Sequence, residues 1–164
     1  MYKLREESNM YKILVAFLVA LAVVPAAASK AAASDKRDVM ATVNQFNDSL
    51  NKGDTKTALA ACAAPSSIID EFPPHQWQGA TACADWANDF ATYNKKYGIT
   101  HPFAKLGTPR HVDITGDRAY VVVPATYTYK QNGKGVTESG STLTVALQKV
   151  ADGWRITGWT WAKR

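Results

Sequence analysis

One stretch of this sequence, residues 66–79 (SSIIDEFPPHQWQG), places the strongest constraint on the possible folds of the chain. It is a short apolar run that ends in a carboxylate, followed by two prolines, a histidine, a tryptophan and a glycine. Proline cannot donate to a strand ladder, so the prolines end a strand predicted over residues 66–72. Helical patterns lie on both sides of this strand, and a long series of strand patterns follows. This order predicts an α+β protein, in which a cone-shaped, curved antiparallel sheet wraps around three helices and Asp70 lies at the end of the first strand.

The first two helices are predicted upstream of this strand. Ser34 and Asp35 are common capping residues and are expected to begin the first helix. Its apolar side chains recur at steps of four, three and four and so share one face: Val39, Val43, Phe46 and Leu50. In the segment 51–54 (NKGD), the glycine ends this helix and the aspartate caps the next one. That second helix is alanine-rich, covers residues 55–64 and stops before Pro65.

The third helix is predicted over residues 79–97. Aromatic side chains follow one side of it and would cover a sheet: Trp86, Phe90, Tyr93 and Tyr97. Four long segments rich in Val, Thr, Tyr and Trp are then predicted as strands, at residues 102–115, 118–131, 136–150 and 154–163. The links between them are short and carry the turn pairs GD, NG and DG, which indicates antiparallel hairpins.

The predicted strands are apolar at both parities. In residues 118–131 one parity holds Val121, Val123, Tyr127 and Tyr129, and the other holds Tyr120 and Val122. In the last strand Trp159 and Trp161 have one parity, and Trp154 and Ile156 have the other. A sheet with one solvated face would alternate apolar and polar residues. We therefore expect helices on one face and a second copy of the chain on the other, which predicts a homodimer through the outer sheet face.

The beginning of the chain has the pattern of a secretory signal peptide. Residues 13–24 hold no polar side chain, Lys12 precedes them, and residues 26–28 (AAA) form an A-x-A cleavage site. Such a run rises only ~18 Å as a helix, whereas a hydrocarbon core is ~30 Å thick, which disfavours the alternative of a retained membrane anchor. The sequence predicts a signal peptide at residues 1–28, with cleavage as late as residue 33, and a periplasmic or secreted protein.

The remainder, residues 34–164, is long enough for a single domain with one core. Lys and Arg number 19 against 14 Asp and Glu, but the basic residues are scattered and their longest runs are pairs. A nucleic-acid-binding surface would cluster them on one face. We therefore expect no nucleic-acid partner, and no membrane contact once the signal peptide is removed.

Cys62 and Cys83 are the two cysteines of the chain, and both follow the predicted signal peptide. In an oxidising compartment a disulfide between them is the first expectation. The alternative is two small buried side chains that never meet. A catalytic thiol is disfavoured, because neither cysteine has a neighbouring histidine or a motif around it.

With these elements in place, the chain resembles the nuclear transport factor 2-like superfamily, which includes ketosteroid isomerase and the SnoaL-like polyketide cyclases. The resemblance covers roughly residues 35–162. Its most specific parts are residues 50–54 (LNKGD), residues 68–70 (IID) with Gly79 nine positions on, and the ending 153–156 (GWRI) with Trp161. The superfamily includes enzymes, carriers, transport adaptors and assembly domains, so the resemblance predicts the fold and leaves the activity open.

Carried over by position, the resemblance places Asp70 where the isomerase has its general base. The position of the isomerase's hydrogen-bonding tyrosine is Phe46 here, which has no hydroxyl. The region that carries its second donor, a protonated acid, is residues 142–147 here, which offer Thr144 and no carboxylate. Loss of one oxyanion donor typically costs about 10²–10³ in rate. Ketosteroid isomerase activity itself is therefore not expected.

Asp70 and His75 are the candidate catalytic residues. Inside an apolar cavity, desolvation would raise the pKa of Asp70 and make it a usable base. His75 follows in the loop after the prolines and could exchange protons with it. The alternatives are that Asp70 caps the following turn or accepts hydrogen bonds from backbone amides, and that His75 is an exposed loop residue hydrogen-bonded to backbone. Glu71 has the opposite strand parity and is expected in solvent.

Seven aromatic residues are expected to line a ligand pocket inside the cone: Phe46, Trp77, Trp86, Phe90, Tyr127, Trp159 and Trp161. The alternative is that these large side chains fill the cone and leave no cavity. The three histidines show no metal-ligand spacing and no phosphate-binding or cofactor motif occurs, so no metal and no cofactor are expected.

Three functions remain open from the sequence. The first is binding of a small hydrophobic or aromatic ligand held by the tryptophans and oriented by Asp70. The second is a cofactor-free acid–base enzyme (an isomerase, cyclase or lyase) that uses Asp70. The third is a non-catalytic dimeric interaction module with a filled cone. The absence of the oxyanion donors favours binding.

Overall fold

The structure is a computed structural model that describes residues 24–164. The chain divides into two units, Met1–Asp35 and Lys36–Arg164. Of the first unit only the helical residues 24–35 are described, and the fold below is that of the second. The predicted signal peptide lies for the most part outside the described residues, so it stays a prediction. Among the described residues, no helix is both long and apolar enough to cross a bilayer.

Helix α2 (Val24–Asn51) begins ten residues earlier than the capping pattern predicted. Ser34 and Asp35 lie inside it and do not begin it. The reason is that the alanine-rich segment before them has high helix propensity and continues the helix. The predicted apolar face is confirmed from Val39 onwards, because Val39 and Val43 are fully buried and Phe46 is nearly so.

Helix α3 (Thr55–Leu59) is shorter than predicted. Asp54 caps it as expected, since its carboxylate accepts a hydrogen bond from the Thr57 amide at 3.0 Å. The predicted helical residues after it are instead taken by strand β1 (Cys62–Ile69). Here a hydrogen bond from the Ile156 amide to the Ala61 carbonyl, 2.8 Å, ties the chain to the last strand, and this pairing outweighs the helix propensity of alanine.

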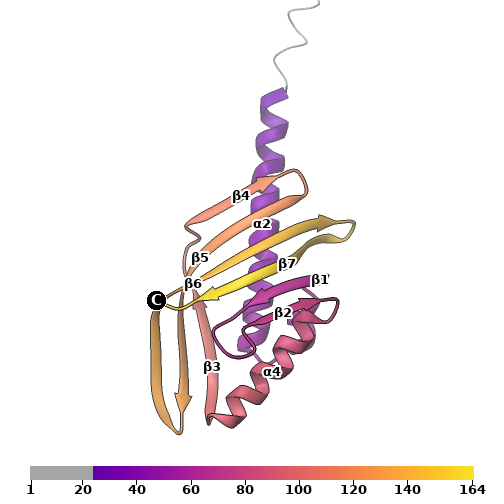
Figure 1. The fold of residues 1–164 in the computed structure, drawn as a ribbon. Helices are drawn as coiled ribbons and strands as arrows, with labels where there is room; N and C mark the ends of the chain where they lie inside the picture. The colour runs from indigo at the N-terminus through magenta and orange to yellow at the C-terminus, as the bar shows by residue number, and fades with distance from the viewer. Residues whose placement is uncertain (1–23) are drawn as a thin grey trace, which may run out of the picture. The chain divides into compact units, whose positions relative to one another are not determined.

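Strand β2 (Gln76–Gly79) forms a hairpin with β1 that the sequence did not predict. Helix α4 (Ala82–Lys96) therefore begins three residues later than expected. Ile68 pairs with Trp77 across this hairpin, so the short strand buries the indole beside the core. Figure 1 shows α4 next to β1, β2 and β3, the elements with which it makes contacts.

The remaining strands are β3 (Ile99–Leu106), β4 (His111–Thr115), β5 (Arg118–Gln131), β6 (Lys134–Val150) and β7 (Gly153–Ala162). The predicted strand 102–115 is thus two strands, divided at the segment 107–110 that contains Pro109, and both pair with β5. The strand order is β2-β1-β7-β6-β5-β3, with β4 also on β5 (Figure 1). Because β1 and β7 are parallel, the sheet is mixed and not wholly antiparallel as predicted. The α+β class and the curvature of the sheet are confirmed, and the sheet formed by the described residues is not closed into a barrel.

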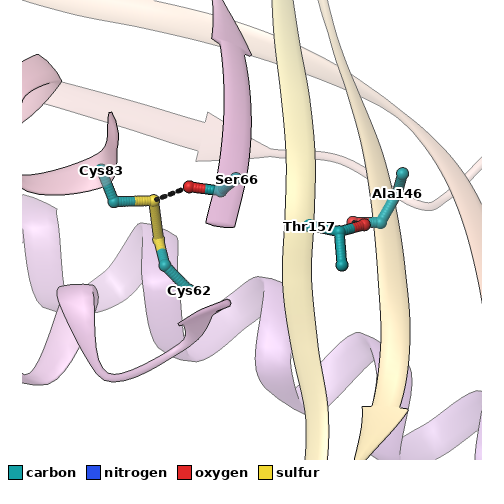
Figure 2. The surroundings of a disulfide bond; sticks show 5 residues. All are labelled: Cys62, Ser66, Cys83, Ala146 and Thr157. Carbon is teal, nitrogen blue, oxygen red and sulfur yellow. Dashed lines mark hydrogen bonds between the residues drawn. A yellow bond between two sulfur atoms is a disulfide. The ribbon is translucent and has the colours of Figure 1, made fainter. Parts of the chain in front are cut away.

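A bulge in β7 changes which way its tryptophans face. Leu147 pairs with Ile156, but Val145 pairs with Trp159, so Thr157 is an extra residue in the ladder. Its hydroxyl donates to the Ala146 carbonyl at 3.2 Å (Figure 2). Paired residues share a face, and Val145 and Leu147 have the same parity. Ile156 and Trp159 therefore both face the core, and the prediction that they lie on opposite faces is wrong.

This bulge removes one of the two observations behind the homodimer prediction. In β5 the buried parity includes Val121 and Val123, whereas Tyr120 on the other parity is 46% exposed. The outer face of the sheet thus keeps some apolar surface, but less than the sequence pattern indicated. The homodimer stays a prediction.

The predicted disulfide between Cys62 and Cys83 is confirmed. It joins the beginning of β1 to the first turn of α4. The Ser66 hydroxyl lies 3.6 Å from the sulfur of Cys83, a contact drawn as a dashed line in Figure 2. The bond holds α4 against the sheet edge formed by β1 and β2, and so fixes the helix that supplies Trp86.

Replacement of both cysteines by alanine should lower the free energy of unfolding by about 3 kcal/mol, because a closed loop of this length restricts the unfolded chain. Urea unfolding followed by circular dichroism measures the change. Wild-type protein with a reductant is the control and should lose a similar amount. Equal stability of the oxidised and reduced wild type would contradict the assignment of a structural role to the bond.

Candidate functional site

A cavity of about 380 Å³ lies inside the second unit. Its walls come from α2, α4, β3 and the inner face of β5, β6 and β7, and the turn after β1 contributes Asp70. Phe103 is 47% exposed and the Lys163 side chain is 50% exposed, so these two lining residues mark the side on which the cavity reaches solvent. The alternative of a completely filled cone is therefore wrong.

Aromatic rings form one wall of the cavity. Trp86 meets Trp159 edge-to-face at 4.8 Å between ring centroids and stacks on Phe90 at 5.2 Å. Phe46 packs against Trp159 at 5.9 Å. Such ring pairs are stabilising beyond their buried area and hold the side chains in fixed orientations. The wall is thus a rigid apolar surface.

Asp70 lies directly after β1, at the boundary between this wall and the turn. One carboxylate oxygen, Oδ2, accepts the indole N–H of Trp86 at 2.8 Å, and the other, Oδ1, accepts the Glu71 amide at 2.7 Å. Burial raises the pKa of Asp70 to about 6, and these two hydrogen bonds offset part of that rise. A carboxylate with such a pKa can both hold and accept a proton near neutral pH.

Charged groups form another part of the cavity lining, called here the charged edge. The ammonium of Lys163 lies 2.7 Å from Glu138 Oε1 and 3.8 Å from Glu71 Oε2. The Tyr129 hydroxyl donates to the same Glu138 oxygen at 3.0 Å. The hydrogen bond to Glu138 raises the pKa of Lys163, so the ammonium stays charged at neutral pH. Burial raises the pKa of Glu71.

Several buried polar atoms of the lining residues have no hydrogen-bond partner. They are the Tyr127 hydroxyl, the Trp159 indole nitrogen, Asn94 Oδ1 and Glu138 Oε2. Unpaired buried polar groups are costly, and in native proteins they usually mark a place for a water molecule or a ligand. The cavity therefore combines an apolar wall with hydrogen-bond donors and acceptors that have no partner among the described residues.

Comparison with protein families identifies the fold around this cavity. Residues 39–160 match the family model described as a SnoaL-like domain, which is most of the chain. The chain belongs to the SnoaL-like domain family. A search of curated proteins found no match for it.

Solved structures similar to this SnoaL-like domain share its fold. A nuclear transport factor 2-like protein with a cystatin-like fold from Novosphingobium aromaticivorans has 15% identity and a TM-score of 0.69, over 86% of this chain and 89% of that chain. A nuclear transport factor 2-like superfamily protein from Salmonella enterica has 18% identity and a TM-score of 0.68, over 80% and 92%. A ketosteroid isomerase-like protein from Erwinia carotovora atroseptica has 14% identity and a TM-score of 0.62, over 79% and 95%.

The structure of this SnoaL-like domain places most of the predicted site residues around the cavity. Asp70 lines it, together with the predicted aromatic residues Phe46, Trp86, Phe90, Tyr127, Trp159 and Trp161. Trp77 does not line it, and its indole N–H donates to Asp89 on α4 at 2.8 Å. His75 does not line it either.

His75 is exposed and does not pair with the Asp70 carboxylate, so the alternative of an exposed loop histidine bonded to backbone is confirmed. Its ring nitrogen Nδ1 lies 3.2 Å from the backbone carbonyl of Asp70, and its own amide donates to the Phe72 carbonyl at 2.9 Å. These contacts, with a φ of 74° at His75, are those of a tight turn between β1 and β2. His75 therefore shapes the turn that holds Asp70 and is not itself in the cavity.

Sequence reasoning missed the charged edge of this SnoaL-like domain. Glu138 faces the cavity because a bulge at Gly140 adds one residue to β6, where Ala125 pairs with Ser141 and Thr126 with Ser139. Gly140 has a φ of 84°, a conformation that suits glycine. An isolated glycine in a strand pattern is the signal that could have revealed this bulge. Glu71 is exposed, as expected, and also lines the cavity.

The cavity contains a tyrosine hydroxyl at a position different from those of the donors that the resemblance predicted as missing. Phe46 lines the cavity without a hydroxyl, and Thr144 is not among the lining residues. Tyr127, on the neighbouring strand β5, brings a phenol to the same space. Burial raises the pKa of Tyr127, so its hydroxyl keeps its proton.

Proposed function

We propose that this protein binds a small, mainly aromatic molecule in the cavity, with a polar group of the ligand directed at Asp70. The observation that carries this proposal is the cavity itself, with its rigid aromatic wall and buried polar atoms that lack partners. A cavity of about 150 Å³ suffices for one benzene ring. The volume here, about 380 Å³, suits a two-ring body with a polar substituent.

Isothermal titration calorimetry with 1-naphthylmethanol tests this proposal. Ala104 lines the cavity from β3, and its cross-strand partner Tyr127 lines it too, so Ala104→Phe places a new ring in the binding space. We expect this substitution to weaken binding about tenfold or more through steric overlap.

The matched control is Ala146→Phe, which makes the same change at an exposed position of β6 that is not among the lining residues. It should leave the affinity close to that of the wild type. Equal affinities of the wild type and Ala104→Phe would place the ligand elsewhere and overturn the proposal.

A second candidate function is acid–base catalysis on the bound molecule, and one observation favours it. Burial brings the pKa of Asp70 to about 6, which suits a general base at neutral pH. Tyr127 supplies an unpartnered hydroxyl in the same cavity that could donate to a developing oxyanion. A turnover that depends on Asp70 and falls below pH 6 would support this function, whereas unchanged turnover in Asp70→Asn would exclude Asp70 as the base.

We further propose that the protein works outside the cytosol. The disulfide between Cys62 and Cys83 supports this location, because such bonds persist mainly in oxidising compartments. Recovery of the oxidised protein, shortened at its N-terminus, from the periplasm or the culture medium would test it. Intact protein confined to the cytosol would contradict it.

A further inference from the structure

The charge inside the cavity is opposite to that of the whole chain. The chain has a formal net charge of +5. Among the residues that line the cavity, three carry carboxylates, Asp70, Glu71 and Glu138, and one carries an ammonium group, Lys163. A basic protein thus gathers excess negative charge in a cavity that has an aromatic wall.

Lys163 does not neutralise this excess. Its ammonium is engaged by Glu138 at 2.7 Å and reaches Glu71 only at 3.8 Å. One cation therefore serves two carboxylates, and Asp70 has neutral donors only, the Trp86 indole and the Glu71 amide. The described contacts leave more than one negative charge in the cavity without a counter-ion.

Glu138 supplies a free acceptor for such a counter-ion. Its side chain is 11% exposed, and while Oε1 accepts from Lys163 and Tyr129, the buried Oε2 has no partner. A buried carboxylate oxygen without a donor is expensive to maintain. A hydrogen-bond donor on the ligand, and above all a charged one, would remove this cost.

The aromatic wall suits the same kind of group. Cations are attracted to the faces of Trp, Tyr and Phe rings, and the attraction strengthens away from water. Trp86, Trp159 and Tyr127 line the cavity together with the carboxylates. Aromatic faces beside unpaired carboxylates form the usual chemistry for recognition of an amine or a quaternary ammonium group.

From these contacts we infer that the cavity selects a hydrophobic amine, whose aromatic body packs on the tryptophans and whose cationic nitrogen lies between Glu138 and Asp70. This inference rests on the proposed binding function and adds the chemical class of the ligand. An anionic ligand would bring a further negative charge to three carboxylates. Burial raises the pKa values of Asp70 and Glu71, and a bound cation would lower them again.

Three probes that share one ring system test the inference at pH 7.5 by calorimetry: 1-naphthylmethylamine, 1-naphthylmethanol and 1-naphthoate. Their bodies are alike, so differences in affinity report the polar group. We expect the amine to bind about tenfold or more tightly than the alcohol, and the carboxylate to bind most weakly.

Two substitutions of opposite effect separate electrostatics from loss of folding. Glu138→Gln keeps the shape and should weaken amine binding about tenfold, and should weaken alcohol binding much less, because a neutral hydroxyl loses no charge–charge attraction. Lys163→Met removes the competing cation and should tighten amine binding. Asp152→Asn and Lys134→Met change the net charge equally at exposed positions that do not line the cavity, and should change neither affinity.

The outcomes distinguish this inference from the binding function on which it rests. Binding of the alcohol with equal or weaker binding of the amine overturns the inference and leaves the binding function standing. If the exposed controls shift amine affinity as much as Glu138→Gln and Lys163→Met do, the effect belongs to net charge and the inference is also overturned. Binding of none of the three probes overturns both.

Discussion

Trp86→Ala should lower the free energy of unfolding by about 4 kcal/mol, the largest stability effect that we expect from any single substitution in this chain. Trp86 is only 5% exposed, and its ring contacts Phe90, Trp159 and Phe46 at once. Removal of the indole leaves a void beside the cavity that these neighbours, held by their own packing, cannot close. It also takes the N–H donor from Asp70. Urea unfolding at pH 7 measures the change.

Trp86→Phe separates the loss of packing from the loss of the hydrogen bond to Asp70. Phenylalanine keeps a ring in contact with Phe90 and Trp159 but has no N–H group. We expect it to cost less than the alanine substitution, and to raise the pKa of Asp70 further, because that hydrogen bond lowers it. A loss below about 1.5 kcal/mol for Trp86→Ala would mean that the aromatic wall is not a packed surface.

Asp70→Asn should stabilise the protein at neutral pH and abolish any reaction that uses the carboxylate as a base. Burial raises the pKa of Asp70 from 3.8 to about 6, so between these values the folded state binds more protons than the unfolded state. The stability contributed by this group is fully present below about pH 4 and is lost as the pH rises through 6. A pKa shift of this size corresponds to about 3 kcal/mol of unfolding free energy. The wild type loses this stability as the pH rises through 6, whereas the variant has no carboxylate at position 70 and does not lose it.

The measurement is the difference in unfolding free energy between the wild type and Asp70→Asn from pH 4 to pH 8. It should be small at pH 4 and grow to about 3 kcal/mol in favour of the variant above pH 7. The Glu71 pKa is raised as well, so a weaker dependence of the same direction persists in the variant.

Asp89→Asn is the matched control for this series. Asp89 also accepts an indole N–H, from Trp77 at 2.8 Å, but it is exposed. The unfolding free energy of this variant should keep the pH dependence that Asp70 causes in the wild type. A difference between the wild type and Asp70→Asn that does not change with pH would show that Asp70 is not desolvated in the folded protein.

The fold and the aromatic half of the site could be predicted because their signals are local. The helical face that begins at Val39 follows from spacing, and the turn pairs mark the ends of the long strands. Asp70 could be placed because it ends an apolar run shortly before the prolines Pro73 and Pro74. Trp86 could be placed because it belongs to the aromatic side of the helix predicted from spacing.

The charged half of the site could not be predicted because single inserted residues decide it. Strand parity gives the face of a side chain only while the ladder is unbroken, and one bulge reverses every residue beyond it. The bulge at Gly140 turns Glu138 inward, and that at Thr157 brings Trp159 to the same face as Ile156. Gly140 carries a local signal, whereas Thr157 is a common strand residue and gives none.

Contacts distant in the sequence explain the other differences. The parallel pairing of β1 with β7 joins Ile68 to Trp159, and no pattern near Ile68 indicates it. Strand β2 forms by pairing with β1, so its formation also follows from the position of β1 in the sheet. The segment around His75 looked like a loop that could present the imidazole to Asp70, but the backbone hydrogen bonds of the turn direct it elsewhere.

The central claim is that a ligand occupies the space between Asp70 and the tryptophans, and the five indole N–H signals of the chain test it most directly. Nitrogen–proton correlation spectra, assigned with single Trp→Phe variants, are recorded while 1-naphthylmethanol is added. Trp86, Trp159 and Trp161 line the cavity, so their signals should shift, while those of Trp77 and Trp154 stay in place. Shifts confined to Trp77 and Trp154, or no shift in any of the five, would contradict the account.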